Sequence, residues 1–270
     1  MRKLSDSAAT ESAIRKHILQ KLRQQGENSW LSGESLSFEL GISRAAVNKH
    51  VLVLREHGSI IESLPRRGYR LISEADAWAD ANVREGLTTQ HLGRGRWLWH
   101  KKAGSTNQIA VLEALGGAEE GLVVVARQQN DGRGEHGHRW LSLPGSLMFS
   151  VLIRPSIAID KLADFPKMAQ YASALAIRKI CMVDVKCVRE NDLYLNNRKI
   201  GGILVESLIQ NDEIKWIVIG IGLNINTPKS FFPKEIFETA SSLYAETGIP
   251  WSFTVLLKKH LEELEDAFYK

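Results

Sequence analysis

Hydrophobic residues near the start of the chain recur at the spacing of an amphipathic helix. Ile14, Ile18 and Leu22 are four positions apart, which places their side chains on one face of a helix. Gly26 follows where such a helix is expected to end. The pattern predicts a first helix with one buried face and one exposed face.

Two more helices are predicted before position 58. The stretch 33–40 has two leucines four positions apart and is followed by a glycine, and Ser43 is a typical N-cap for a helix over 44–57. Two helices joined by a tight, glycine-containing turn have the spacing of a helix-turn-helix motif, whose second helix reads DNA. The sequence therefore predicts a DNA-reading helix directly after Ser43.

Two β-like runs surround residues 65–68, Pro-Arg-Arg-Gly, and predict a hairpin wing with two arginines at its tip. These elements together predict a winged helix-turn-helix domain over residues 1–73. Arginine and asparagine form paired hydrogen bonds with guanine and adenine edges, whereas serine and lysine suit phosphates. The side chains expected to contact DNA are Ser43, Arg44, Asn48, Lys49, Arg66 and Arg67.

The pattern changes after residue 73. Residues 74–88 are mixed and polar and are expected to form a helical linker to a second domain over 89–270. Strand-like runs fall at 96–103, 121–129, 146–155, 183–188, 191–207 and 214–226. Helical patterns fall near 106–116, 160–181 and 251–270. Strands interleaved with few helices favour an α+β fold with a mixed β-sheet.

Charge separates the same two regions. Residues 1–73 hold 12 Lys and Arg against 7 Asp and Glu, a net charge of +5, and the remainder holds 23 of the 35 basic and 24 of the 31 acidic residues, a net charge of −1. This asymmetry is typical of a polyanion-binding module joined to another domain. No apolar run is long enough to span a bilayer and no signal peptide is expected, so we expect a cytoplasmic protein without a membrane partner.

The stretch 128–140, QQNDGRGEHGHRW, contains Gly132, Gly134 and Gly137 at the G-x-G-x-x-G spacing of dinucleotide-binding loops. A true fingerprint opens a helix directly after a strand, but Pro144 would interrupt a helix here almost at once. Backbone N–H groups and arginines can still hold a phosphate. The loop therefore predicts an anionic ligand bound outside a Rossmann fold.

Several stretches, in order along the chain, resemble the family of bifunctional biotin protein ligases and biotin operon repressors. They are residues 32–58, 64–71, 104–108, 128–140, 191–206, 219–226 and 240–243. One stretch alone would be weak evidence, whereas the ordered set covers nearly the whole chain. The resemblance implies a winged helix-turn-helix followed by a class II synthetase-like mixed β-sheet ligase domain with flanking helices.

The resemblance also implies an activity in two steps. Biotin and ATP, with Mg²⁺, form biotinyl-5′-AMP, and a lysine of a biotin carboxyl carrier protein domain then attacks this mixed anhydride. In family members that carry the N-terminal domain, the adenylate promotes a homodimer that binds operator DNA. The implied ligands and partners are therefore biotin, ATP, Mg²⁺, the carrier domain, operator DNA and a second copy of the chain.

The resemblance assigns roles to matching positions. Lys199 matches the lysine beside the carboxylate and the α-phosphate, and it is expected to be catalytic together with Arg133 of the glycine loop. The positions implied to bind biotin are Ser105, Thr106, Asn107, Gln129, Gly132, Gly134, Gly201 and Gly202. Those implied to bind the nucleotide are Trp140, Asn191, Asp192, Asn224 and Lys186.

Three features depart from the family pattern. The family has Lys-Trp-Pro before the Asn-Asp pair; without gaps its lysine becomes Val188, whereas a two-residue insertion matches it to Lys186. Glu135 stands where ligases carry an arginine, which places a negative charge beside the expected phosphate. The family usually adds a small SH3-like C-terminal domain, and this chain is expected to lack it.

These departures leave two functions open. The first is a biotin-responsive repressor with an active ligase domain. The second is a transcription regulator, derived from a ligase, that binds biotin or a related small ligand with little or no ligase activity.

Overall fold

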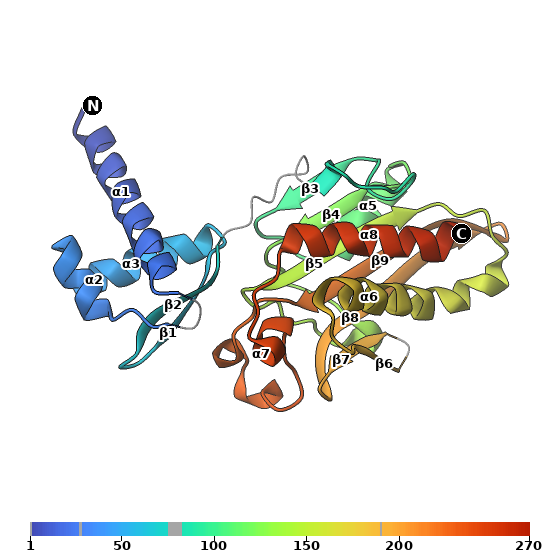
Figure 1. Ribbon diagram of the computed structural model, residues 1–270. Coiled ribbons are helices and arrows are strands. Elements are labelled where there is room, and N and C mark those ends of the chain that lie inside the picture. Colours follow the sequence, from blue (N-terminus) through green and yellow to red (C-terminus); the bar gives the residue numbers. More distant parts are fainter. Residues whose placement is uncertain (1, 27–28, 75–82, 190) are drawn as a thin grey trace. The chain divides into compact units, whose positions relative to one another are not determined.

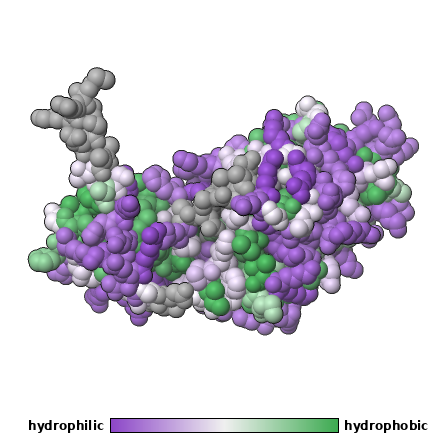
Figure 2. Space-filling model, turned by 45° about the horizontal axis from the view of Figure 1, so that its top comes forward, coloured by the Kyte–Doolittle hydropathy of each residue, from purple (hydrophilic) through white to green (hydrophobic). Residues whose placement is uncertain are grey.

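The computed structural model describes residues 2–26, 29–74, 83–189 and 191–270 (Figure 1). The chain divides into two compact units, Met1–Asp76 and Ala77–Lys270. The face drawn in Figure 2 is mostly hydrophilic, with small and separate hydrophobic patches. Within the described ranges, no helix combines the length and the apolar character needed to cross a membrane.

The first unit has the order helix, helix, helix, strand, strand. Its elements are α1 (Arg2–Gln24), α2 (Gly33–Leu40), α3 (Arg44–Glu56), β1 (Ile60–Leu64) and β2 (Gly68–Ser73). The Ser43 hydroxyl accepts a hydrogen bond from the Ala46 N–H at 3.2 Å, which caps α3 as the sequence predicts. Ile18, Leu36 and Val47 bring the three helices together in one buried cluster. The predicted winged helix-turn-helix is confirmed.

The second unit is built on a seven-stranded sheet with the strand order β3-β4-β5-β9-β8-β7-β6. The strands are β3 (Trp97–His100), β4 (Val123–Ala126), β5 (Ser146–Ile153), β6 (Lys186–Val188), β7 (Asp192–Leu195), β8 (Arg198–Gln210) and β9 (Glu213–Asn224). The pair β3 and β4 is parallel and the other pairs are antiparallel, so the sheet is mixed, as predicted.

Helices cover the two faces of this sheet differently. The long helices α6 (Phe165–Cys181) and α8 (Phe253–Tyr269) lie side by side across one face, where Phe149 and Val151 of β5 join the main core (Figure 1). The shorter α5 (Thr106–Leu115) packs on the opposite face against Leu152 and Val218. Because alternate residues of a strand point to opposite faces, β5 supplies both cores.

The N-terminal boundary of the second unit lies earlier than predicted. Residues 74–88 are predicted to be a linker, yet Val83 and Leu87 are buried in the core of the second unit, with exposed fractions of 1% and 6%. Their apolar side chains gain free energy by leaving water, so this end of the segment belongs to the folded unit. Residues 75–82 of the predicted linker lie outside the described residues.

Candidate functional site

A cavity of about 570 Å³ lies in the second unit, on the sheet face that carries α5. Its floor contains three glycines, Gly202 on β8 with Gly220 and Gly222 on β9. Gly202 and Gly222 are cross-strand neighbours, so together they leave a flat area of backbone without side chains. The volume suits a small molecule of several rings or groups.

Close contacts explain why two of these floor positions, Gly220 and Gly222, carry no side chain. A Cβ atom on Gly220 would lie 1.9 Å from the Asn107 Oδ1, and one on Gly222 would lie 2.6 Å from the Trp140 Cε2. The Trp140 indole therefore rests directly on the floor. Gly201 differs, since its Cβ would lie 2.5 Å from Leu223 in the core. The structure places Gly202 in the cavity and Gly201 on the other face of the sheet, so only Gly202 fits the role implied for the pair.

One end of the cavity is formed by the first turn of α5. Ser105 is the N-cap of this helix, and its side chain accepts from the Gln108 N–H at 3.5 Å. The Gln129 Oε1 accepts hydrogen bonds from the Thr106 N–H at 2.6 Å and from the Thr106 hydroxyl at 3.1 Å. These bonds orient the Gln129 amide and leave its Nε2 donors for a ligand. This end therefore offers neutral hydrogen-bonding groups.

Two polar residues beneath this end were not predicted from the sequence. Ser150 is completely buried, and its hydroxyl lies 2.8 Å from the Thr106 Oγ1 and 2.6 Å from the Asn107 Oδ1. The Asn107 Nδ2 in turn donates to Glu206 at 2.9 Å. The available signal was the single serine inside the otherwise apolar run 147–153. These bonds fix the side chains that face the ligand.

The other end of the cavity carries charged groups. The Lys199 Nζ lies 2.5 Å from the Asp192 Oδ1, and the Asp192 side chain is almost fully buried. The Lys199 backbone is fixed by the segment 239–241, because its N–H donates to Thr239 at 2.8 Å and its carbonyl accepts from Ser241 at 2.9 Å. This arrangement aims an ammonium group into the cavity from β8.

The glycine loop closes over the cavity as a short hairpin. The Trp140 N–H donates to the Gly132 carbonyl at 2.9 Å, and the Gly134 N–H donates to the His138 carbonyl at 2.7 Å. Gly134 lines the cavity and Gly132 does not, and a Cβ atom on Gly132 would lie 2.7 Å from the Trp140 carbonyl oxygen. Arg133 lines the cavity too, and its guanidinium lies 3.6 Å from Asp131. Glu135 faces the same space, so the loop presents a carboxylate as well as arginines.

Trp140 has an unsatisfied donor. Its indole Nε1 is buried and has no hydrogen-bond partner among the described residues. Buried N–H groups are rarely left unpaired, because the lost hydration costs about 1–3 kcal/mol. The Nε1 atom faces the floor, since it would lie 3.0 Å from a Cβ atom on Gly222.

Two residues expected to bind the nucleotide lie outside this cavity. The Asn224 amide is used within the protein, since its Oδ1 accepts from the Ser146 hydroxyl at 3.1 Å and its Nδ2 donates to the Ser241 carbonyl at 3.0 Å. Lys186 is exposed on β6 and lines a separate hollow with Glu246. By contrast, the expected Asn191 and Asp192 both line the cavity.

The cavity has other linings that were not predicted as site residues. They are Glu135, His138, Arg139, Arg189, Tyr194, Ile203, Leu204, Gly220, Ile221 and Gly222. Several of them lie on strands whose apolar pattern gives no hint of a site. No group of three or more His, Cys, Asp or Glu side chains suited to a metal ion occurs among the residues that the structure describes.

The first unit carries a groove of about 870 Å³ between α3 and the wing. Of the side chains expected to contact DNA, Arg44, Asn48 and Arg66 line it. Tyr69, which was not predicted, lines the groove and its hydroxyl lies 3.4 Å from the Asn48 Oδ1. The remaining expected contacts, Ser43, Lys49 and Arg67, do not line it.

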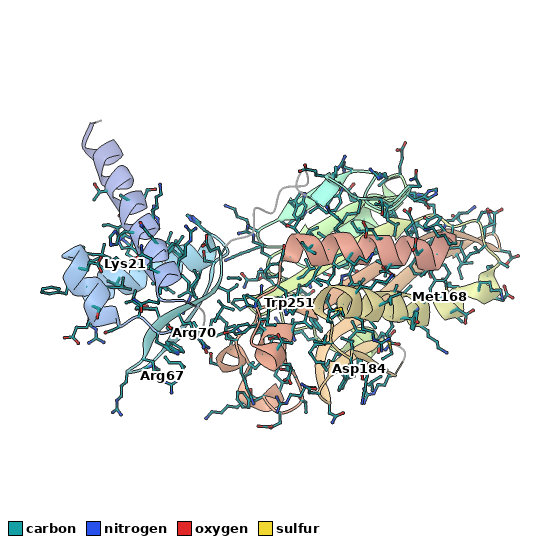
Figure 3. All side chains as sticks on the ribbon, in the orientation of Figure 1. Lys21, Arg67, Arg70, Met168, Asp184 and Trp251 are labelled. Carbon is teal, nitrogen blue, oxygen red and sulfur yellow. The ribbon has the colours of Figure 1, made fainter. Side chains whose placement is uncertain are left out.

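The arginines of the wing have different surroundings. Arg67 and Arg70 both extend from the wing (Figure 3), and both approach the Trp30 ring, at 6.0 Å and 4.8 Å from its centroid. Arg70 also forms an ion pair with the buried Glu62 at 2.6 Å. Arg70 therefore stabilises the base of the wing, while Arg66 at its tip borders the groove.

Comparisons with known proteins agree with this division. Residues 99–224 match the Biotin/lipoate A/B protein ligase family, and residues 14–70 match an HTH domain. Over 238 residues the chain is 34% identical to the bifunctional ligase/repressor BirA of Bacillus subtilis (strain 168), which covers 88% of this chain and 73% of that protein. The chain belongs to the BirA family of bifunctional ligase/repressors. This membership favours the first of the two functions left open by the sequence.

Two further known proteins are similar to this chain. The Escherichia coli (strain K12) bifunctional ligase/repressor BirA is 34% identical over 199 residues, or 72% of this chain and 59% of that protein. The biotin protein ligase from Aquifex aeolicus, solved in complex with biotin and ATP, superposes with a TM-score of 0.56 at 29% identity. That match covers 64% of this chain and 70% of the Aquifex chain.

Proposed function

We propose that this protein is a biotin protein ligase that also acts as a biotin-responsive, DNA-binding repressor. The observation that carries the proposal is the polarity of the cavity on the α5 face. Thr106 and Gln129 offer neutral hydrogen-bonding groups at one end, and Lys199 offers a cation at the other. Biotin has the matching polarity, because its ureido ring is uncharged and its valeryl chain ends in a carboxylate.

In the first step, a carboxylate oxygen of biotin attacks the α-phosphorus of ATP, and pyrophosphate leaves. Negative charge develops on the phosphoryl oxygens, where the Lys199 ammonium and the Arg133 guanidinium stabilise it. Lys199 must exchange part of its contact with Asp192 for the reacting groups. In the second step, a carrier lysine amine attacks the acyl carbon of biotinyl-5′-AMP, and AMP leaves.

Asn191 and Asp192 supply side-chain oxygens at the charged end of the cavity. Mg²⁺ is usually held by one or two carboxylates together with substrate phosphates, so this pair fits that ion. When bound there with ATP, Mg²⁺ would neutralise part of the phosphate charge. Asp192 also holds Lys199 in place at 2.5 Å before the substrates arrive.

The groove between α3 and the wing is the proposed operator-binding surface, with Arg44, Asn48 and Arg66 as its contacts. Ser43, Lys49 and Arg67 would then contact the phosphate backbone at its border. An operator with two half-sites is read by two copies of such a unit, so we propose a ligand-promoted homodimer. We also place the protein in the cytoplasm, where ATP and DNA are both present.

One assay tests the proposal. The full chain is incubated with biotin, ATP, Mg²⁺ and a biotin carboxyl carrier domain, while pyrophosphate release and carrier labelling are measured. We expect both to occur and to require biotin. Biotin-dependent retention of DNA with neither pyrophosphate release nor labelling would instead establish the sensor without ligase activity. No binding of biotin at all would refute the proposed ligase and the biotin-responsive repressor, and would leave only a regulator that binds a related small ligand.

A further inference from the structure

We infer that Arg189 binds the phosphate groups of the nucleotide. The sequence left open whether Val188 or Lys186 matches the lysine of the family's Lys-Trp-Pro motif, and Arg189 would supply the positive charge in its place. This inference rests on the proposed function, because it concerns the ATP that the ligase would use. It identifies a residue particular to this chain as the source of the positive charge on the nucleotide side of the cavity.

The position of Arg189 is the first observation. Arg189 follows the end of β6 and lines the cavity together with Asn191, Asp192 and Lys199. Its backbone is left-handed, with φ 54°, so the chain turns sharply there. Lys186 lies three residues earlier in β6 and faces a different hollow. Of the two candidate cations in this segment, the structure brings only Arg189 to the cavity.

The turn that presents Arg189 is anchored from inside the protein. The Nε2 of Gln170, a buried residue of α6, lies 3.1 Å from the Val188 carbonyl, 3.3 Å from the Arg189 carbonyl and 2.7 Å from the Asp192 carbonyl. The Asn191 carbonyl also accepts a hydrogen bond from the Ile203 N–H of β8, at 2.8 Å. These bonds hold the backbone on both sides of the turn. Arg189 is therefore presented by a fixed part of the cavity wall.

Within the part of the chain that the structure describes, the guanidinium of Arg189 is also unpaired and can bind a ligand. The positively charged arginine and lysine side chains that line the cavity are Arg133, Arg139, Arg189 and Lys199. Lys199 is paired with Asp192, and Arg133 and Arg139 both contact oxygen atoms of the glycine loop. Among the described residues, the Arg189 guanidinium has no hydrogen-bond or ion-pair partner. It can therefore offer two parallel N–H donors to a phosphate, the arrangement in which arginine binds phosphate most strongly.

The test compares Arg189→Gln with Lys186→Gln, a matched control that removes one positive charge from the same segment. For each variant, the KM for ATP is measured by pyrophosphate release, and the dissociation constants of biotin and adenosine are measured by calorimetry. We expect Arg189→Gln to raise the KM for ATP by about tenfold or more, since hydrogen bonds to charged groups carry effects of that size. The affinities for biotin and for adenosine, which has no phosphate, should change less than about twofold by the same reasoning.

Two further results bear on the inference. Arg189→Lys should recover part of the ATP affinity, because it restores the charge without the paired donors. An unchanged KM for ATP in Arg189→Gln, or a larger effect in Lys186→Gln, would overturn the inference while leaving the ligase proposal intact. If Arg189→Gln lost as much affinity for adenosine as for ATP, Arg189 would maintain the shape of the site and would not bind phosphate. A wild-type chain that uses neither biotin nor ATP would refute the proposed function itself.

Discussion

Lys199 and Asp192 form the shortest ion pair at the charged end of the cavity, with 2.5 Å between Nζ and Oδ1. The two residues lie on the antiparallel neighbours β8 and β7, so the register of that strand pair sets their separation. The carboxylate is almost fully buried, whereas about a third of the lysine side chain is exposed. The ammonium is thus held by a fixed carboxylate while remaining accessible to a ligand in the cavity.

Replacement of this ammonium should slow the formation of the adenylate. We expect Lys199→Gln to lower kcat for pyrophosphate release by roughly 100- to 1000-fold, the range seen when one stabilising donor of an oxyanion is removed. Lys215→Gln is a matched control, since Lys215 also pairs with a carboxylate at 2.5 Å but lies outside the cavity. Equal kcat values for Lys199→Gln and the wild type would show that Lys199 does not stabilise the transition state of adenylate formation.

Reversal of the charge at Glu135 should strengthen binding of the adenylate. Glu135 lines the cavity in the glycine loop, where its carboxylate would repel the phosphate of biotinyl-5′-AMP. The repulsion amounts to about 1–4 kcal/mol at 4 Å for effective dielectric constants of about 80 to 20. We expect calorimetry to give a several-fold tighter dissociation constant for Glu135→Arg, and a smaller gain for Glu135→Gln.

Glu119→Arg makes the same change of charge at an exposed position outside the cavity, and it serves as the control for Glu135→Arg. Its affinity for the adenylate should match that of the wild type. If both arginine variants bind equally well, the effect is one of net charge, and the proposed placement of the loop over the phosphate fails.

Removal of either arginine from the groove of the first unit should weaken DNA binding. We expect Arg44→Ala and Arg66→Ala each to cost about 1–3 kcal/mol in operator affinity if they contact base edges, and to reduce the salt dependence by about one ion if they contact phosphates. Gel-shift titrations at several salt concentrations separate these cases. Lys16→Ala removes the same charge from an exposed position of α1 and should have little effect. Unchanged affinity in both arginine variants would contradict the assignment of the groove.

Acid should destabilise the second unit through His260. This side chain is fully buried on α8, where burial lowers its pKa from 6.5 to about 4. The unfolded chain therefore takes up the proton at a higher pH than the folded chain. The contribution of His260 to the free energy of unfolding is constant above pH 6.5, and it is lost as the pH falls from 6.5 towards 4.

The size of this effect can be measured by denaturant unfolding at two pH values. Between pH 7 and pH 5, His260 should remove about 2 kcal/mol of stability from the wild type. Over the same pH interval, the loss of stability in His260→Leu should be smaller than that in the wild type by about this amount, whatever the stability of the variant at pH 7. An identical pH dependence in the two proteins would show that His260 titrates normally in the folded state.

The local elements and their order could be predicted from the amino-acid sequence. Ser43 predicts the start of α3, and the structure shows its capping hydrogen bond at 3.2 Å. The apolar pattern of 146–155 predicts a strand, and β5 forms over Ser146–Ile153. These features depend on residues close together in the chain, so periodicity and capping chemistry are sufficient to find them. The ordered motifs also placed Thr106, Gln129 and Lys199 in one site.

Which of two neighbouring residues reaches the cavity could not be predicted from the sequence and depends on the packed fold. Gly202 lines it and Gly201 does not, because adjacent residues of a strand point to opposite faces. Arg189 lines the cavity and Lys186 does not. The backbone at Arg189 is held by Gln170 of α6, a helix that lies earlier in the chain and packs beside it. Strand register and contacts between distant segments set these outcomes, and neither is encoded in a local pattern of residues.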